Sequence, residues 1–277
     1  VANALWIDER YPANRRFMET VGSIYDAQAR TIDFFTPGAH DVINRWVAEQ
    51  TNGKIGAIID RLEPDMRMVL TNATYLDALW QRPFDANDTR KRDFQAPDSV
   101  LRTPFMHSTT NLHVLETADA IGVLIPYADP RFSFFAIMGH DGIPISRWVV
   151  SQGPSLLKRI METPSETGMT RVELALPKFT DRFESPLSNV LRLMGLELPF
   201  DPRRADFSGM SEMGARDLYV DEILHKTFIR VDEKGTEAAA VTAIIMRATS
   251  VAPSGKRIVF DRPFLYGIVD HETEETL

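Results

Sequence analysis

The segment at residues 232–247, DEKGTEAAAVTAIIMR, constrains the fold of this chain most, because it is compatible with two secondary structures. Gly235 and Thr236 can cap a helix, and Glu237 followed by three alanines favours one. The second half is instead rich in β-branched residues, which favour strands. The local sequence therefore leaves two interpretations open, a short surface helix and a strand.

A period of two divides the side chains of residues 236–247 into two different faces. One parity carries no charge, and its members are Thr236, Ala238, Ala240, Thr242, Ile244 and Met246. Both charges, Glu237 and Arg247, fall on the opposite parity. A strand with one uncharged face can enter a core, and small residues at its start fit a narrow gap. We infer that residues 235–247 are stored outside β-structure in the intact molecule and can later become a strand.

Composition narrows the class of protein. The 277 residues carry a formal net charge of −8, and 44% are hydrophobic and 25% charged, which is ordinary for a soluble globular protein. The acidic balance argues against a dedicated binder of nucleic acid or of anionic membranes. The basic run at residues 90–92 is too short to change this, and we interpret it as a solvated loop. Without cysteine there is no disulfide, no thiolate nucleophile and no cysteine-based zinc site.

Hydrophobic periodicity predicts a mixture of helices and strands. Helices are expected at residues 12–26, 39–50 and 186–194, with apolar sides formed by Phe17, Val21, Ile24 and Tyr25 in the first and by Val42, Ile43, Trp46 and Val47 in the second. Strands are expected at residues 1–7, 67–79, 121–127, 132–138, 172–176, 223–231, 257–260 and 264–269. Because strands and helices do not alternate regularly, we expect an α+β fold with large, mostly antiparallel sheets. No repeat or linker divides the chain, so we expect a single domain over residues 1–277.

The sequence contains no motif of a known type of active site. It has no nucleophile elbow, no phosphate-binding loop, no dinucleotide fingerprint and no zinc-protease helix. His107 and His113 are poorly spaced for a metal, so we expect neither a metal site nor a cofactor. Asn72 and Asn87 each begin a glycosylation sequon, but Asn72 is interpreted as a buried polar residue and the Asn87 sequon as chance. We therefore expect a protein that is not an enzyme.

Several short segments match, in order along the chain, the motifs of one known family. They are HK at residues 225–226, VDEKGTEAAA at 231–240 and DRPFL at 261–265, and upstream of them INRWV at 43–47, TNGKI at 51–55, LTNATYL at 70–76 with Trp80 and RPF at 82–84, LPKF at 176–179 and ADFSGM at 205–210. On these residues the chain resembles the serpin family over nearly its whole length.

The resemblance implies a serpin-like fold with an exposed reactive-centre loop, and an inhibitor of serine proteases. In this family a protease cleaves the loop and is held as an acyl-enzyme while the loop inserts as a new strand of the main sheet. The resemblance also implies a secreted, extracellular monomer that binds neither nucleic acid nor membranes. Serpins begin with several helices and strands ahead of Val1 and end with a further core strand after Leu277, so we expect both to be missing here.

Roles for individual residues follow from the resemblance alone. The residues matching the family's hinge are Glu233, Gly235, Thr236, Glu237, Ala238, Ala239, Ala240 and Val241. Trp80 and Lys178 match the breach, the place at the top of the main sheet where insertion begins, and Lys178 is the expected partner of Glu233. Asn72 and His225 match the hydrogen-bonded pair of the shutter, which helps to hold the sheet closed.

Counting from Glu233 with the family's spacing places the reactive bond between Thr249 and Ser250. A small β-branched residue there suggests an elastase-like or chymotrypsin-like target. Cleavage after Arg247 would instead suit a trypsin-like protease. The alternative function is that of a non-inhibitory serpin with a chaperone, carrier or storage role, although such relatives usually have bulky, charged or proline residues in the hinge.

Overall fold

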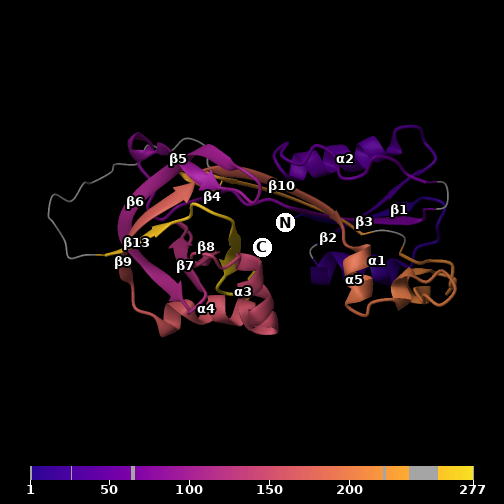
Figure 1. Cartoon of the computed structure of the whole chain (residues 1–277). Coiled ribbons are helices and arrows are strands. Elements are labelled where there is room, and N and C mark those ends of the chain that lie inside the picture. The colour runs from indigo at the N-terminus through magenta and orange to yellow at the C-terminus, as the bar shows by residue number, and fades with distance from the viewer. Residues whose placement is uncertain (1, 26, 64–65, 221–222, 237–254, 277) are drawn as a thin grey trace. The chain divides into compact units, whose positions relative to one another are not determined.

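The computed structural model describes residues 2–25, 27–63, 66–220, 223–236 and 255–276. They form two compact units, one made of residues 1–75 and 181–229 and the other of residues 76–180 and 230–277 (Figure 1). Within each unit, helices pack against β-strands. No helix in the described ranges has the length and hydropathy needed to cross a bilayer.

The sheet of the first unit is built around β1 (Ala2–Asp8). This strand pairs in parallel with β2 (Ala27–Ile32) and antiparallel with β3 (Met68–Thr74). β11 (Leu224–Val231) runs parallel to β3 through residues 225–227, and β10 (Phe179–Pro186) pairs with β11. The order β2-β1-β3-β11 therefore places segments from both ends of the chain in one sheet.

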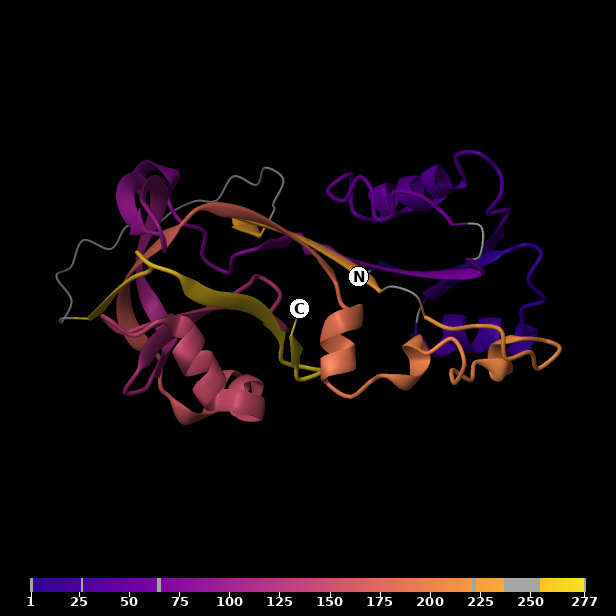
Figure 2. The same cartoon turned by 45° about the vertical axis from the view of Figure 1, so that its right-hand side comes forward.

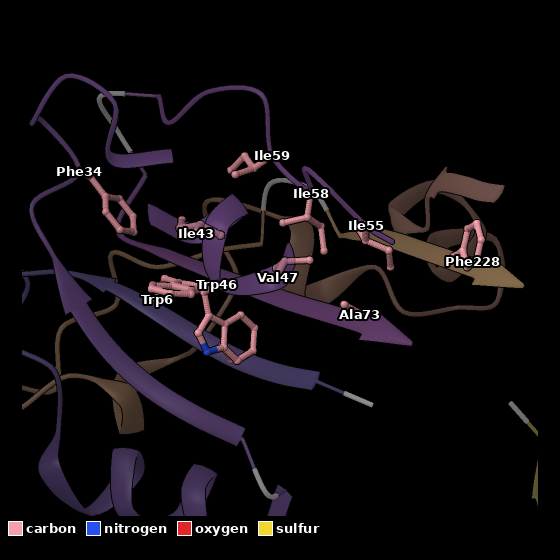
Figure 3. Packing of buried hydrophobic residues seen from close by; sticks show 11 residues of the cluster. Trp6, Phe34, Ile43, Trp46, Val47, Ile55, Ile58, Ile59, Ala73 and Phe228 are labelled. Atoms are coloured by element: carbon pink, nitrogen blue, oxygen red, sulfur yellow. The ribbon is translucent and has the colours of Figure 1, made fainter. Parts of the chain in front are cut away.

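Different helices cover the two faces of this sheet, because side chains alternate along β1. The helical elements of the unit are α1 (Arg15–Tyr25), α2 (Ala39–Gln50), α5 (Ser188–Leu193), η3 (Leu198–Phe200) and η4 (Ser208–Met210). Trp6 faces α2 and meets the ring of Trp46 edge-on, with 5.6 Å between centroids (Figure 3). Leu5 and Ile7 face the other way and belong to a cluster that includes side chains of α1.

The second unit contains a larger sheet with the order β13-β9-β6-β7-β8-β14-β15, and β5 also pairs with β6. Its strands are β5 (Arg90–Gln95), β6 (Val100–Glu116), β7 (Ala120–Pro126), β8 (Phe132–Gly139), β9 (Thr170–Pro177), β13 (Lys256–Val259), β14 (Phe264–Asp270) and β15 (Glu275–Thr276). The long strand β6 joins two parts of the sheet, because residues 105–112 pair with β9 and residues 113–116 with β7.

Helices of the second unit pack against its strands β8 and β14 (Figure 2). They are α3 (Ile145–Gln152) and α4 (Leu156–Glu166), accompanied by the short turns η1 (Ala86–Asp88) and η2 (Gly153–Ser155). Trp148 of α3 and Ile160 of α4 are fully buried against Phe135 and Ile137 of β8. The same unit holds two short strands that pair with each other, β4 (Ala78–Leu79) and β12 (Gly235–Thr236).

Most of the elements expected from the sequence are present. The predicted helix at residues 39–50 is confirmed as α2 with the same bounds, and the predicted strands at 121–127 and 132–138 are confirmed as β7 and β8 within one residue. The helices expected at 12–26 and 186–194 are shorter, as α1 and α5. Ile24 and Val42, which were expected on apolar sides, are exposed.

Two expectations about local structure were wrong. Residues 90–92 are not a solvated loop, because they begin β5, in which Arg92 is the register partner of Thr103 in β6. The strand expected at residues 67–79 is divided into β3 and β4 by residues 75–77. In both cases pairing with a strand distant in sequence, and not local propensity, decides the conformation.

Candidate functional site

The short strand β12 is the centre of the candidate site, because it lies at the start of the segment with two compatible structures. Gly235 pairs with Leu79 and Thr236 with Ala78 of β4, while Thr236 also pairs with Val231 of β11. The backbone N–H of Asp232 donates to the carbonyl of Gly235 at 3.0 Å and closes the turn between β11 and β12. The expectation that residues from 235 onward are stored outside β-structure is therefore wrong for Gly235 and Thr236.

Gly235 is required at its position by the closeness of β4. A Cβ atom added there would lie 2.0 Å from the carbonyl oxygen of Ala78 and 2.8 Å from the Cα of Leu79. Both contacts are with backbone, so a side chain cannot be accommodated by a rotamer change. Only glycine allows β12 to pair with β4 in this register.

Glu233 precedes β12 and is fixed by both its side chain and its backbone. The Nζ of Lys178 donates to Oε2 at 2.6 Å, and the hydroxyl of Thr89 donates to Oε1 at 2.7 Å. The backbone N–H of Phe84 donates to the carbonyl of Glu233 at 2.8 Å. Burial alone raises the pKa of Glu233, but the hydrogen bonds from Lys178 and Thr89 together outweigh it, and the pKa lies below the ordinary 4.5.

A lowered pKa makes this contact sensitive to acid. The contribution of the Glu233 carboxylate to stability is complete above the ordinary pKa of 4.5 and is lost as the pH falls through the lower value of the folded state. Because the Lys178 side chain is 36% exposed, solvent screens the pair. We expect Glu233→Gln to lower the free energy of unfolding by about 1 kcal/mol at pH 7, and the difference from wild type to shrink as the pH falls below 4.5.

Urea unfolding of both proteins between pH 7 and pH 3 measures this difference. Glu173→Gln is the matched control, because Glu173 and Arg257 form an ion pair in which both side chains are about 60% exposed (60% and 61%). That variant is expected to be as stable as wild type at every pH. A stability difference for Glu233→Gln that is constant with pH would contradict the role of the charge.

Trp80 anchors the turn that leads into β12. Its backbone N–H donates to the carbonyl of Lys234 at 2.9 Å, and its indole Nε1 donates to the carbonyl of Asp232 at 2.8 Å. The buried indole is stacked on Tyr127, with centroids 4.7 Å apart and planes 9° apart, and meets Phe134 edge-on. One side chain therefore joins the turn at residues 232–235 to the core of the second unit.

Comparison with known proteins identifies the family. The sequence model of the serpins, described as serine protease inhibitors, matches residues 1–277. The chain belongs to the serpin family. It is 34% identical over 275 residues to an uncharacterized serpin-like protein of Thermococcus kodakarensis, covering 98% of this chain and 63% of that protein. Serpin-Z1C of Triticum aestivum is 34% identical over 279 residues, which are 96% of this chain and 69% of that protein.

Solved serpin structures share the fold. Tengpin, a thermophilic serpin in its native state, aligns with a TM-score of 0.87 and 31% identity over 99% of this chain and 70% of its own. Thyroxine-binding globulin in complex with thyroxine aligns with a TM-score of 0.84 and 26% identity over 100% and 72%. The predicted serpin-like α+β fold is thereby confirmed. The chain spans 63% of the length of the Thermococcus kodakarensis protein and of a second serpin-like protein, from Methanosarcina acetivorans.

The two residues matching the shutter of this serpin lie side by side on neighbouring strands. Asn72 of β3 is the register partner of His225 of β11. The expected hydrogen bond between them is not found among the described residues, because the amide of Asn72 donates to Oδ1 of Asn3 on β1 at 2.8 Å. The ring of His225 instead meets Phe183 edge-on, with 6.3 Å between centroids.

The structure thus brings Lys178 into contact with Glu233, as the serpin resemblance implied, and Trp80 donates a hydrogen bond to the carbonyl of Asp232 in the same turn. The remaining hinge residues and the expected reactive bond lie outside the described residues. They are Glu237, Ala238, Ala239, Ala240, Val241, Arg247, Thr249 and Ser250. No group of metal-ligating side chains is found within the described ranges.

Sequence reasoning missed two residues of the site, Thr89 and Tyr127. Thr89 follows the turn η1 and is distant in sequence from Glu233, to which it donates its hydrogen bond. Tyr127 comes directly after β7, and its hydroxyl lies 2.6 Å from that of Thr236. The apolar run at residues 121–127 placed Tyr127 only at the end of an expected strand, because no local pattern contains its partner.

Proposed function

We propose that this serpin inhibits serine proteases as a suicide substrate. The Oγ of the protease serine attacks the carbonyl carbon of Thr249, the C–N bond to Ser250 breaks, and the new amine leaves with a proton. An ester then joins the protease to the serpin. The segment that begins at Thr236 inserts as a strand next to β11 and distorts the active site of the protease before water hydrolyses the ester.

The observation that carries this proposal is the position of β12. Thr236 has strand neighbours on both sides, Val231 on one side and Ala78 on the other, and Gly235 pairs with Leu79. A strand that grows from Thr236 therefore continues an existing pairing and does not have to nucleate a new one. The uncharged parity of residues 236–246 supports insertion with one face toward the core.

The free energy of insertion is sufficient to make the step one-way. Each new strand hydrogen bond contributes about 0.5–1.5 kcal/mol net, so a dozen residues give several kcal/mol or more. Burial of Ile244 and Met246 adds about 1.5–3 kcal/mol each. Each 1.4 kcal/mol, roughly, changes an equilibrium constant tenfold. A total of several kcal/mol therefore favours the inserted state by several powers of ten.

The experiment that tests the proposal uses the full-length protein and three proteases. Chymotrypsin, elastase and trypsin are each mixed with the serpin and analysed on a denaturing gel. We expect a covalent complex with elastase or chymotrypsin, and mass spectrometry is expected to find Ser250 at the new N-terminus of the released peptide. A new N-terminus two residues earlier would assign the bond to Arg247 and a trypsin-like target.

A non-inhibitory role is the second candidate, and the structural similarity to thyroxine-binding globulin favours it. The small hinge residues Thr236, Ala238 and Ala240 favour the inhibitor. Clean cleavage of the loop with a rise in thermal stability but without a covalent complex would support the non-inhibitory serpin. Cleavage with neither effect would contradict loop insertion altogether.

A further inference from the structure

The hydroxyl groups of Tyr127 and Thr236 form a buried pair. Their oxygen atoms are 2.6 Å apart, and Tyr127 is fully buried while Thr236 is 1% exposed. Among the residues that the structure describes, neither hydroxyl has another hydrogen-bond partner. Each group therefore depends on the other, because a buried hydroxyl left without a partner is costly.

The position of the Tyr127 hydroxyl is fixed by the backbone hydrogen bonds of the two neighbouring residues and by the stacking of the Tyr127 ring. The backbone N–H of Gln81 donates to the carbonyl of Pro126 at 3.0 Å, and that of Ala128 donates to the carbonyl of Leu79 at 2.7 Å. These bonds join the residues on both sides of Tyr127 to the segment with which β12 pairs. The stacking on Trp80 fixes the ring plane.

The protonation state of Tyr127 suits a permanent hydrogen bond. Burial raises its pKa far above the usual value for tyrosine, and the bond to Thr236 lowers it by less. The phenol therefore remains protonated at any physiological pH and can always donate or accept. The pair does not function as a pH switch.

We propose that Tyr127 is a positioning residue for loop insertion, whose hydroxyl holds the side chain of Thr236 toward the core and so fixes which face of the inserting strand is buried. In a strand, a slip of one residue moves every side chain to the opposite face. In the inserted strand of the proposed mechanism, an inward Thr236 would direct Ala238, Ala240, Thr242, Ile244 and Met246 inward as well, and Glu237 and Arg247 outward. The opposite parity would bury both charges.

This inference rests on the proposed inhibitory function and adds a determinant of its efficiency. Loop insertion competes with hydrolysis of the acyl-enzyme. A strand whose first side chain, that of Thr236, already points toward the core inserts sooner and traps more of the protease. When the hydroxyl pair is broken, more serpin is cleaved for each protease molecule that is inactivated.

The test is a double-mutant cycle on the full-length protein, with the number of serpin molecules consumed per protease inactivated as the readout. Tyr127→Phe keeps the stacked ring and leaves the Thr236 hydroxyl unpaired, so this number is expected to rise by roughly five- to thirtyfold. Thr236→Val is expected to raise it similarly. The double variant lacks the same hydroxyl pair as each single variant, so it is expected to raise this number no further than either single variant does.

Two further variants separate positioning from general stability. Thr236→Ser keeps the hydroxyl and is expected to match wild type. Tyr11→Phe alters another buried tyrosine, whose hydroxyl lies 3.4 Å from Asp217. This variant is expected to consume as many serpin molecules per protease inactivated as wild type. Thermal unfolding of each intact variant verifies that it is folded.

The outcomes distinguish this inference from the proposed function. If wild type traps no protease, both the proposed inhibitory function and the positioning role are wrong. If wild type traps protease and Tyr127→Phe does so equally well, only the positioning role is wrong. The positioning role would also be wrong if the fold-increases of the two single variants multiplied in the double variant, because the two hydroxyls would then act independently.

Discussion

Replacement of Gly235 by alanine is expected, under the proposed mechanism, to convert the protein from an inhibitor into a substrate. The new Cβ would lie 2.0 Å from the carbonyl oxygen of Ala78, so β12 cannot keep its pairing with β4. Overpacking of this kind costs about 1–3 kcal/mol, which corresponds to a factor of roughly 5 to 150 in the equilibrium between paired and displaced strand. We expect the fraction of protease trapped as a covalent complex to fall by roughly tenfold or more, while cleavage of the loop continues.

The matched control for this prediction is Gly168→Ala in the same unit. A Cβ at Gly168 meets no atom within 4 Å, so its substitution is expected to leave trapping unchanged. The trapped and cleaved fractions are measured together from band intensities on a denaturing gel. Trapping by Gly235→Ala at the wild-type level would contradict the requirement for β12 to pair with β4.

Substitution of Trp80 by alanine is expected to have the largest effect on stability. The indole is 2% exposed, and its removal empties a space lined by Phe84, Tyr127 and Phe134. Trp→Ala changes in protein cores cost about 3–5 kcal/mol. The variant also loses the hydrogen bond to the carbonyl of Asp232, so the turn before β12 loses its anchor. Urea unfolding of the full-length protein measures the loss as a lower midpoint.

Conservative variants separate the ring from the hydrogen bond. Trp80→Phe keeps an aromatic ring but leaves the Asp232 carbonyl without its donor, at an expected cost of about 1–3 kcal/mol. Trp148→Phe is the matched control, because the Nε1 of the equally buried Trp148 has no partner among the described residues. It loses no hydrogen bond and is expected to be less destabilising. A larger loss of stability in Trp148→Phe than in Trp80→Phe would contradict the anchoring role of Trp80.

The elements that sequence patterns predicted well are those whose burial follows one period. Helix α2 has Ile43, Trp46 and Val47 buried on one side, and it begins directly after Gly38, whose positive φ of 82° favours glycine. Strand β8 is buried along nearly its whole length and reads as a continuous apolar run. In both elements the local pattern and the tertiary environment agree.

Strands β5 and β6 were not predictable because their environment changes along their length. β6 pairs with β9 through residues 105–112 and with β7 through residues 113–116, and its polar centre includes Ser108, Thr109 and Thr110. β5 begins with three basic residues and forms only because β6 provides its hydrogen-bond partners. No local period describes a strand that changes neighbours.

The candidate site was predictable in part. The resemblance to serpins implied that Glu233 meets Lys178, and these side chains form an ion pair. It also implied a hydrogen bond between Asn72 and His225, but Asn3 takes the amide of Asn72 instead. The partnership of Tyr127 with Thr236 depends on a sheet that brings residues 109 positions apart into contact, which a local motif does not encode.

Hydrogen exchange of backbone amides tests loop insertion most directly. The full-length protein is compared before and after cleavage between Thr249 and Ser250, and the amides of residues 237–248 are followed by mass spectrometry. We predict that after cleavage these amides exchange as slowly as those of β11, because they have become part of the same sheet. Rapid exchange of residues 237–248 in the cleaved protein, with β11 and β3 still protected, would contradict insertion.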